Sequence, residues 1–586
     1  MKSTTRLLPA FLVLLAPIAA AQTPTALLVG RVMSGRTPLP GVTVTVSSRS
    51  SVVTRSTITG GTGKYAIDAL PPGRYNVTFT REGYQTVSRP AELHLGLTGR
   101  ADANLKATDV VESISLTAAT PSILEAAQIA TTLAPSLVDE LPIRRGLPSR
   151  ALLAPAVLLT PEGALTVNGE VATGTLYLID GVPSRSADGR PKLVIEEALD
   201  ETTVMTGAIP AEYGSFSGGV IAASTRSGSN ELTGSLRIDV LQHADDLLQA
   251  TVGGRVIDDR LWFFGAGAAG DEGTASQRRA QAKFTGAITE SQFGVASYTH
   301  GFDGDSDAGS ALSLHYNAEV GGDTVVEALY GRSPADRPSW IVKGSHIFSA
   351  SWTGIHSFSA GVEQLAFGER RAIFVDDRWS TRKRWTIAAG LRYDDRLQPR
   401  LAAIYDLHGD GLRRVSAGWA RYNQGDRSVD EVTADYGVQI SNNGFVRLSA
   451  IRRTSDGERT WRAAELQWNY SLLGIVDFGG YYTLTDGPDS ATGWIIVQPP
   501  TGFGRVSFAI LEPYRDGNEE TDLSGTFAFP VSNATAFVKA DLVNAFGGHG
   551  VAGVQSATTI DATTVVQPHG MVGQPRTWRL AVGVRF

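Results

Sequence analysis

Three aspartates, Asp303, Asp305 and Asp307, have the clearest spacing for chemistry, in the segment DGDSDAG. Alternating carboxylates of this kind are typical of calcium-binding loops. Here the glycine comes one place late and no glutamate follows at the closing position, so the coordination shell would be incomplete. We therefore expect a solvated acidic loop and no metal, with weak calcium binding as the alternative hypothesis.

The motifs of the common enzyme classes are missing from the sequence. There is no GxSxG, no glycine-rich loop ending in lysine and no HExxH, and none of the nine histidines lies four residues from another. Cysteine is absent, which excludes a disulfide framework, a zinc thiolate site and a cysteine nucleophile. We expect no catalytic residue and no cofactor, so the chain is not predicted to be an enzyme.

The composition favours a membrane protein built from strands. Hydrophobic residues make up 42% and charged residues 19%, yet the mean hydropathy is only -0.05. No internal segment offers 18 consecutive apolar residues, so a membrane crossing would have to use strands, which turn only alternate side chains to lipid. The net charge of -7 is mild for 586 residues and indicates no nucleic-acid partner.

The first 21 residues have the pattern of a secretory signal peptide. Lys2 and Arg6 supply a positive start, residues 7–18 are mostly apolar, and residues 19–21 are three alanines at the predicted cleavage site. Two prolines interrupt the apolar stretch, which is too short to span about 30 Å of hydrocarbon as a helix. The mature chain is therefore predicted to begin near Gln22, outside the cytoplasm.

Residues 232–586 show a period-two alternation that repeats about twenty-two times. In the last segment every second residue is apolar, and the residues between them are small or charged. An even number of such strands, joined by short turns on one side and longer loops at 300–309, 423–430, 485–490 and 546–575 on the other, predicts a 22-stranded antiparallel transmembrane β-barrel in contact with outer-membrane lipid. The apolar residues of the last segment are Trp578, Leu580, Val582, Val584 and Phe586.

Aromatic and charged residues of this region give two further expectations. Trp262, Trp379, Trp461 and Tyr481 lie near predicted strand ends and fit the interfacial girdles of a barrel. The predicted inward positions are mixed in charge and indicate no single solute; they include Arg392, Glu465, Lys539 and Asp541. The final strand with its terminal aromatic residue also resembles the signal that the barrel-assembly machinery reads.

Residues 22–106 contain short strands at regular spacing, separated by Pro-Gly and Gly-Gly turns, which predicts a small β-sandwich. The segments LPGVTVTV, TGGTGKYAIDALPPGRYNVTF and EGY resemble the carboxypeptidase regulatory-like domain. That resemblance implies a non-catalytic accessory module, here in the periplasm. The only histidine of the region is His94, with no zinc-binding motif around it.

Residues 107–119, ATDVVESISLTAA, are predicted to be an extended linker. Part of the linker resembles a TonB box, which implies that it pairs as an added strand with TonB, the periplasmic energy-coupling protein. An exposed strand that lends its backbone hydrogen bonds is suited to this mode of recognition. The box-like residues are Glu112, Ser113, Ile114, Ser115, Leu116, Thr117 and Ala118.

Residues 120–231 are predicted to form an α+β domain that begins with a helix over residues 123–132. Asp180-Gly181 after an apolar run indicates a hairpin, and Gly218-Gly219 would let a strand pass close to another backbone. The ordered set LIDGV, AEYG, SGG and STRSGSNELTGS resembles the plug domain of TonB-dependent outer-membrane receptors, particularly the Oar-like group. The AEYG residues are Ala211, Glu212, Tyr213 and Gly214.

Together these resemblances imply a monomeric TonB-dependent transporter or receptor of the bacterial outer membrane, with residues 120–231 occluding the barrel. Its solute is not identified by the sequence, and the short connections of the barrel region leave little room for large ligand-binding loops. The alternative hypothesis is an outer-membrane adhesion or surface-organisation protein without transport.

Overall fold

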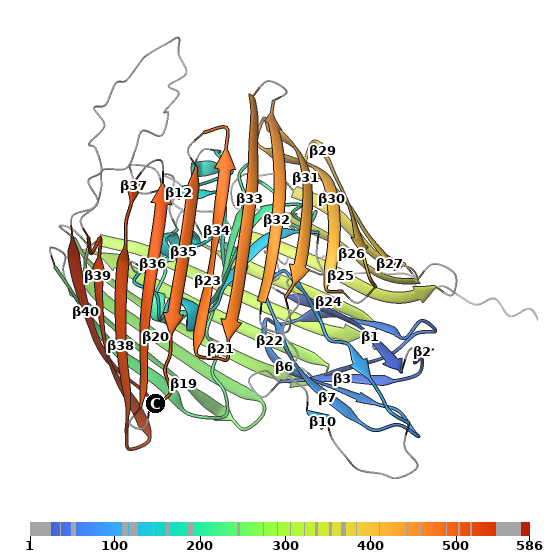
Figure 1. Cartoon of the computed structure of the whole chain (residues 1–586), viewed down its shortest axis with the longest axis horizontal. Coiled ribbons are helices and arrows are strands. Elements are labelled where there is room, and N and C mark those ends of the chain that lie inside the picture. The colour runs from blue at the N-terminus through green and yellow to red at the C-terminus, as the bar shows by residue number, and fades with distance from the viewer. Residues whose placement is uncertain are drawn as a thin grey trace, which may run out of the picture.

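A computed structural model gives the fold, which consists of a sandwich, a barrel and a domain inside the barrel (Figure 1). It describes residues 25–107, 115–116, 127–546 and 576–586, with gaps at 36, 49–53, 144–145, 160–163, 171, 185–190, 243–245, 273–274, 290, 305, 321–322, 334–337, 351–353, 365–370, 382–383, 410, 441–443, 457–458, 488, 502–503 and 516–517. The signal peptide expected at residues 1–21 lies outside these. Among the described residues, no helix has the length and apolar character needed to cross a membrane.

The N-terminal domain is the predicted β-sandwich, made of two five-stranded sheets. Alternate residues of each strand point inward, and they include Leu28, Val77 and Phe79, all fully buried. One sheet contains β1 (Ala26–Ser34), β2 (Thr37–Pro38), β5 (Lys64–Leu70), β8 (Thr98–Arg100) and β9 (Ala103–Asn104). The other contains β3 (Thr43–Ser47), β4 (Arg55–Ile58), β6 (Gly73–Thr80), β7 (Val87–Leu93) and β10 (Ser115–Leu116).

The second domain, which we call the plug, is built on a mixed five-stranded sheet in the order β11-β16-β17-β14-β15. Its strands are β11 (Ile129–Leu133), β14 (Leu176–Ile179), β15 (Val182–Pro183), β16 (Leu199–Gly207) and β17 (Val220–Thr225), with a separate hairpin of β12 (Val157–Leu159) and β13 (Leu165–Val167). Short helical segments are α1 (Pro135–Val138), α2 (Leu147–Ala151), η1 (Ala172–Gly174) and η2 (Glu196–Ala198).

The prediction of a helix over residues 123–132 is wrong for the part of this range that the structure describes. Residues 129–133 form β11, which pairs antiparallel with β16 at the edge of the sheet. The segment IATTL is rich in β-branched residues, which fit a pleated surface better than a helix. Tertiary pairing with β16 therefore decides the conformation of this segment.

The third domain is a closed antiparallel barrel, in which β18 pairs with β40. Apart from the two-residue β37, the described residues supply 22 barrel strands, which confirms the predicted fold class. The strands are β18 (Thr233–Leu241), β19 (Leu247–Ile257), β20 (Leu261–Glu272), β21 (Ala275–Thr289), β22 (Gln292–Asp303), β23 (Ser306–Val320), β24 (Thr324–Arg332), β25 (Ser339–Ala350), β26 (Gly354–Gln364), β27 (Arg371–Thr381), β28 (Trp385–Tyr393), β29 (Leu397–Asp406), β30 (Arg413–Gln424), β31 (Arg427–Gln439), β32 (Gly444–Ser455), β33 (Arg459–Leu472), β34 (Val476–Thr485), β35 (Ser490–Val497), β36 (Arg505–Arg515), β37 (Asn518–Glu519), β38 (Asp522–Val531), β39 (Ala534–Val543) and β40 (Thr577–Arg585).

The two faces of the wall differ as the alternation predicts. On β18, Leu236 and Ile238 are exposed on the outside, whereas Arg237 and Asp239 are buried on the inside. An outer face of large apolar side chains suits lipid, and an inner face of polar ones suits contact with a polar partner. The predicted apolar series of the last strand, from Trp578 to Phe586, is exposed at every second residue.

Three of the four aromatic residues expected at the membrane interface face the plug instead. Trp262 is buried and donates to Asn230, and the Tyr481 hydroxyl donates to the Leu152 carbonyl at 2.9 Å. Trp461 lies against Gly169. Position near a strand end does not fix which face a side chain takes, because a shift of one residue reverses it. The side chains of these three residues face the interior of the barrel.

Two of the longer loops expected at one barrel end are tight hairpins. β22 continues to Asp303 and pairs with β23 from Ser306, and β30 continues to Gln424 and pairs with β31 from Arg427. Gly304 and Gly425 adopt positive φ angles of 64° and 58°, which glycine tolerates without steric cost. The expected loops at 300–309 and 423–430 are therefore mostly strand.

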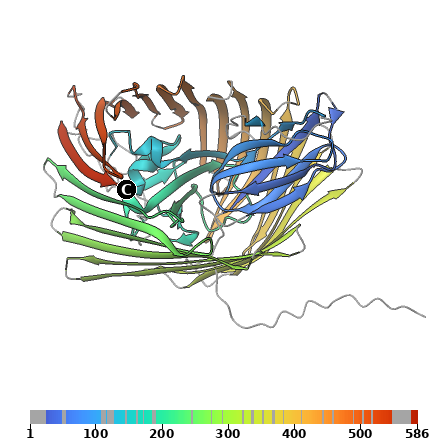
Figure 2. The same ribbon diagram turned by 90° about the horizontal axis from the view of Figure 1, so that it is seen from below.

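The plug lies inside the barrel, and the sandwich lies at one mouth, as the view in Figure 2 shows. Ser380 of β27 and Asp406 at the end of β29 lie at this mouth, beside β1 and β5 of the sandwich. Lys64 of the sandwich donates to the Thr381 carbonyl of the wall at 2.6 Å, and Ser357 of the wall donates to Asp68 at 3.5 Å. The sandwich is thus in direct contact with the barrel that it precedes.

Candidate functional site between plug and barrel wall

The loop of residues 211–214, which carries the AEYG motif, lies against the inner wall. Asp376 on β27 accepts a hydrogen bond from the Ala211 amide, with 3.1 Å between the atoms. Arg400 on β29 donates to the Tyr213 carbonyl at 2.8 Å. The wall therefore holds this loop by its backbone, through charged side chains that reach inward from two strands.

Gly214 lies directly against an arginine side chain of the wall. A Cβ atom at this position would overlap the guanidinium of Arg392 on β28. The same guanidinium donates to the Ala211 carbonyl at 3.3 Å and forms an ion pair with Glu363 on β26. Arg392, predicted as an inward wall position, is thus a contact between plug and barrel.

Glu212 shares a lysine of the wall with a second carboxylate. The Lys343 ammonium lies 3.1 Å from the Glu212 carboxylate and 2.8 Å from that of Glu327 on β24. Burial raises the pKa of Glu212, and the nearby Lys343 opposes that rise. One ammonium therefore bridges plug and wall, and its loss would leave two carboxylates facing each other.

The SGG motif is held by a second arginine and by close packing. Arg453 on β32 donates to the carbonyls of Ser217, at 2.8 Å, and Gly218, and it forms an ion pair with Glu431 at 2.6 Å. A Cβ on Gly219 would lie 2.7 Å from a backbone oxygen of β16. A Cβ on Gly218 would lie 2.9 Å from the Val167 carbonyl oxygen, so the two glycines allow close packing against β13 and β16.

Asp180 and Gly181 form the predicted hairpin turn, and the aspartate also contacts the wall. Both residues have positive φ angles, 45° and 73°, as a two-residue hairpin between β14 and β15 requires. The Asp180 carboxylate accepts hydrogen bonds from the amide and hydroxyl of Thr225 at 2.8 and 2.5 Å. Lys283 on β21 lies 3.3 Å from it.

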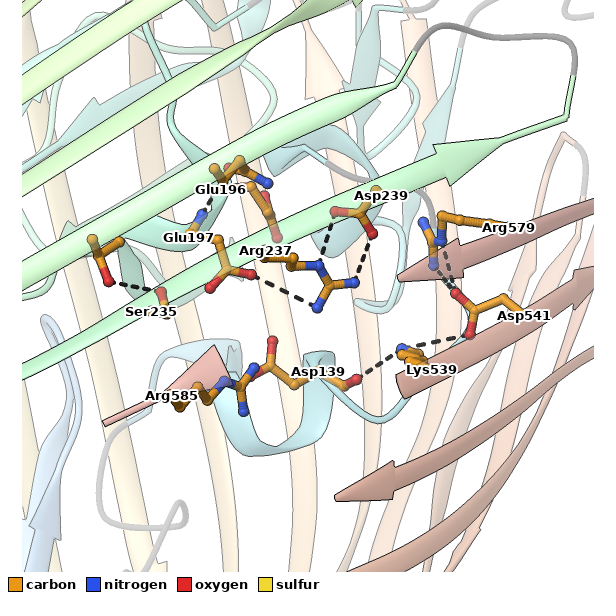
Figure 3. A network of polar contacts seen from close by, with 12 residues as sticks. Asp139, Glu196, Glu197, Ser235, Arg237, Asp239, Lys539, Asp541, Arg579 and Arg585 are labelled. Carbon is orange, nitrogen blue, oxygen red and sulfur yellow. Dashed lines mark hydrogen bonds and ion pairs between the residues drawn. The ribbon is translucent and has the colours of Figure 1, made fainter. Parts of the chain in front are cut away.

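The plug residues around α1 are held at the seam where β40 meets β18 and β39. Lys539 donates to the carbonyls of Asp139 and Leu141, both at 2.7 Å, and Arg585 lies 2.9 Å from the Asp139 carboxylate. Figure 3 shows Asp139 with Lys539 and Arg585, beside the Arg579–Asp541 ion pair of the wall. The closing seam of the barrel is thus also a place where the plug is attached.

The four charged side chains predicted to point into the barrel are all buried on its inner face. Arg392 and Lys539 contact the plug, as described above. Asp541 pairs with Arg579 within the wall, and Glu465 on β33 lies opposite Ser449 of β32. Alternation along a strand therefore identifies the face of a side chain but not its partner.

In most of these contacts the wall supplies the cation and the plug supplies a carbonyl or a carboxylate; Asp376, which accepts from the Ala211 amide, has the opposite arrangement. Ion pairs that exclude water need good geometry to compensate for desolvation, and removing one partner leaves an uncompensated charge. A polar interface of this kind is specific in position. Apolar clusters lie between the polar contacts, and the largest packs Trp494 and Ile496 of β35 with Leu141 of the plug. The arrangement suits a domain that must be seated firmly and released.

The sandwich is also joined to the plug. His94 Nδ1 lies 2.8 Å from the Glu201 carboxylate of β16, and the same carboxylate accepts a hydrogen bond from the Leu95 amide at 2.7 Å. Leu95 and Leu97 pack in one apolar cluster with Tyr213 of the plug. Burial lowers the pKa of His94, but the hydrogen bond and charge of Glu201 outweigh it, so the net pKa is raised.

The TonB-box-like segment is described only at Ser115 and Leu116. These two residues form β10, which runs parallel to β7 at the edge of the sandwich. The other five residues of the segment lie outside the described part of the chain.

Asp303 and Asp307, two of the three aspartates of the weak calcium-binding hypothesis, lie on different strands. Asp303 ends β22 and Asp307 belongs to β23, where its carboxylate accepts a hydrogen bond from the Gly309 amide at 2.6 Å. Asp305 lies outside the described residues. Within the described residues, no three His, Cys, Asp or Glu side chains gather as a metal site would require.

Sequence reasoning did not find most wall residues of this interface. Four of them lie in strands with ordinary alternation: Lys343, Arg400, Arg453 and Glu431. Their place at inward-facing positions of that alternation was the one available signal. A guanidinium at an inward position next to lumenal glycines would have been a sound candidate, because glycine admits such a side chain closely.

Comparison with known proteins agrees with this architecture. The model of the carboxypeptidase regulatory-like domain matches residues 28–106. The TonB-dependent transporter Oar of Myxococcus xanthus is 28% identical over 272 residues, a match that covers 39% of this chain and 25% of the relative. The chain thus spans about a quarter of the length of that curated relative.

Solved structures match the fold over most of the chain. The siderophore receptor PirA from Acinetobacter baumannii has a TM-score of 0.62 at 12% identity, covering 78% of this chain and 98% of that one. The ferric-catecholate import receptor Fiu from E. coli K12 has a TM-score of 0.62 at 11% identity, covering 80% and 97%. The matched proteins are transporters and receptors, not enzymes, and a closed 22-stranded barrel of this kind belongs to the outer membrane. The chain carries a carboxypeptidase regulatory-like domain at 28–106, is similar to the TonB-dependent transporter Oar, and has the barrel fold of siderophore TonB-dependent receptors.

Proposed function

We propose that this chain is a TonB-dependent transporter, which takes up a solute across the outer membrane and is gated by its plug. The observation that carries the proposal is the seating of the plug inside the barrel through charged side chains of the wall. A barrel of 22 strands has a lumen that must be filled to prevent leakage. The plug fills this lumen. Hydrogen bonds from Arg453 to the SGG carbonyls and from Arg400 to the AEYG loop hold it there and can be broken to release it.

The order of elements along the chain supports coupling through residues 112–118. This segment precedes β11, the edge strand of the plug sheet, which pairs with β16 alone among the described strands. Ile129 at the start of β11 pairs with Gly207 at the end of β16. Tension applied by TonB would therefore reach the edge strand first and then the adjacent AEYG loop, where the wall holds the plug.

We also propose the remaining partners on sequence grounds. The chain acts as a monomer in outer-membrane lipid, and its last strand, from Trp578 to Phe586, is read by the barrel-assembly machinery. The outward side chains of this strand are exposed, as a lipid-facing strand requires.

Deletion of residues 112–118 tests the proposal. Cells carrying the full chain and cells carrying the deletion would be grown in the same medium, and the loss of solutes from the medium would be compared by mass spectrometry. We expect at least one solute to be depleted by the full chain alone. Equal amounts of folded barrel in both outer membranes, and loss of binding to purified TonB on deletion, are the controls.

An adhesion or surface-organisation protein would behave differently. Its cells would show the same solute profile with and without residues 112–118, while removal of the whole chain would change attachment to surfaces or to other cells. That combination would contradict the transport proposal and support the alternative.

A further inference from the structure

The sandwich packs directly against the plug loop that carries the AEYG motif (Figure 2). Leu95 and Leu97 share one apolar cluster with Tyr213 of this loop and with Ala420 of β30. Gly96, between the two leucines, has a φ angle of 67°, and a Cβ atom there would lie 2.6 Å from the Tyr213 hydroxyl oxygen. The plug loop is therefore covered on one side by the barrel wall and on another by the sandwich.

The wall holds the sandwich as well as the plug. Thr25 donates to the Glu327 carboxylate of β24 at 3.1 Å, and Arg378 of β27 donates to the Thr98 hydroxyl. The same strand β27 carries Asp376, which accepts from the plug loop. The sandwich and the plug loop are thus docked on neighbouring side chains of the same strands.

One chain of polar contacts runs from the sandwich through the wall to the plug. Glu327, which accepts from Thr25, lies 2.8 Å from the Lys343 ammonium, and this ammonium lies 3.1 Å from the Glu212 carboxylate of the plug loop. Groups that share one network are energetically coupled. Moving Glu212 away from Lys343 therefore also alters the contact that holds the sandwich.

A cavity of about 180 Å³ lies where the three domains meet. Each domain contributes part of its lining: Leu27 and residues 96–98 from the sandwich, residues 208–210 and Glu212 from the plug, and Lys343, Asp376 and Arg400 from the wall. The sandwich thus forms one side of the space that adjoins the plug loop. Undocking of the sandwich would enlarge that space.

We propose that the docked sandwich keeps the plug seated, so that the sandwich must undock before the plug can move toward the periplasm. This inference rests on the proposed function for the direction of the pull, because TonB acts from the periplasmic side. Residues 112–118 lie in the sequence between Ala107 of the sandwich and Ala127 of the plug. A pull on them therefore acts on the sandwich as well as on the plug.

A sandwich that served only as a tether would behave differently. The firmness of its docking would then have no effect on the opening of the channel. If the sandwich keeps the plug seated, tighter docking must delay opening and looser docking must promote it. The two directions can be tested separately, and both tests use the full chain.

The first test joins the sandwich covalently to the wall. The chain has no cysteine of its own, so Asp68→Cys/Ser357→Cys introduces a single pair, at positions whose side-chain oxygens lie 3.5 Å apart. Opening in planar bilayers would be recorded against urea concentration for the oxidised and the reduced protein. The matched control is Arg74→Cys/Glu92→Cys, a pair on neighbouring strands within the sandwich whose charged groups also lie 3.5 Å apart.

We expect oxidation of Asp68→Cys/Ser357→Cys to shift opening to higher urea. At a fixed urea concentration the open fraction should fall about tenfold or more, because a covalent link opposes undocking. Oxidation of the control pair should leave opening unchanged. Mass spectrometry would verify each disulfide, and heat-modifiable migration in gels would verify the folded barrel.

The second test loosens the docking with Gly96→Asn. Asparagine tolerates a positive φ angle better than most residues, so the main effect is a side chain forced against Tyr213. The matched control is Gly83→Asn, in the same domain, where φ is 78° and an added Cβ would have no neighbour within 4 Å. Gly96→Asn should open at lower urea than Gly83→Asn, while pulse proteolysis shows the sandwich still folded.

The proposal is wrong if the cross-linked protein opens at the same urea concentration as its reduced form. Should the disulfide not form, the proposal is wrong if Gly96→Asn and Gly83→Asn open at the same urea concentration. These measurements involve neither TonB nor a solute. Unchanged solute uptake after deletion of residues 112–118 would therefore contradict transport alone, and unchanged opening would contradict the role of the sandwich alone.

Discussion

The interior of the sandwich and the interface between plug and wall are both buried, yet they differ in the charge that they contain. The sandwich core consists of side chains such as Leu28 and Phe79. The plug meets the wall through apolar clusters and also through buried charged groups such as Arg453 and Glu431. An apolar core stabilises a domain that stays folded, whereas the charged groups of the plug interface can be hydrated when it separates. The difference indicates which boundary in this molecule is made to open.

The largest expected effect comes from removing Arg453, which binds plug carbonyls and forms a buried ion pair with Glu431 of the neighbouring wall strand. Arg453→Ala leaves Glu431 buried without its partner and removes the donors to the SGG carbonyls, so we expect plug seating to weaken by about 3–5 kcal/mol. In planar bilayers, the variant should open at lower urea concentration than the wild type. Arg452→Ala changes the next residue, which is exposed on the opposite face, and should behave as the wild type. If the wild type and both variants opened at the same urea concentration, the role of Arg453 in seating the plug would be contradicted.

A substitution in the sandwich core should affect the unfolding of the sandwich more than the opening of the channel. Leu28→Ala removes a fully buried side chain, and we expect the sandwich to lose about 2–5 kcal/mol of unfolding free energy. Pulse proteolysis in urea would report the loss as a lower midpoint for cleavage within residues 26–104. The urea concentration at which the channel opens should stay closer to that of the wild type than with Arg453→Ala. A larger shift in opening than in cleavage would remove the distinction between the two regions.

The smallest expected effect is on the contact between sandwich and plug, and it depends on pH. The pKa of His94 is raised in the folded protein because the bond and charge of Glu201 outweigh the effect of burial. The stabilisation is therefore fully present below the ordinary histidine pKa of about 6.5 and is lost as the pH rises through the higher folded value. Fluorescence transfer between labels on sandwich and barrel should show weaker docking at higher pH.

His94→Gln is the control for this pH dependence. The variant has no titrating group at the position, so its docking should vary less with pH between about 5.5 and 8.5 than that of the wild type. If both proteins showed the same slope, another group would be responsible.

The alternation of side chains made the barrel predictable, because a strand that separates lipid from a polar interior must repeat every two residues. Arg392 and Lys539 were correctly placed on the inner face on this ground. Their partners were not predictable: Arg453 and Gly218 are separated by 235 positions, and nothing local sets the register between plug and wall.

Two errors have the same origin. The helix expected over residues 123–132 yielded to pairing with β16, and Trp461 turned inward to Gly169 rather than outward to lipid. In both cases a contact with a distant segment overrode a local preference. The close approach predicted at Gly218-Gly219 is present, since a Cβ at these positions would lie 2.9 and 2.7 Å from backbone oxygens.

The central claim is that the plug fills the lumen and that its seating closes the channel. Planar bilayer recordings of the full chain and of a variant lacking residues 127–231 test it most directly. We predict no steady conductance for the full chain and a large, stable conductance for the deletion variant, with both barrels folded. A full chain that conducts as well as the deletion variant would contradict the account.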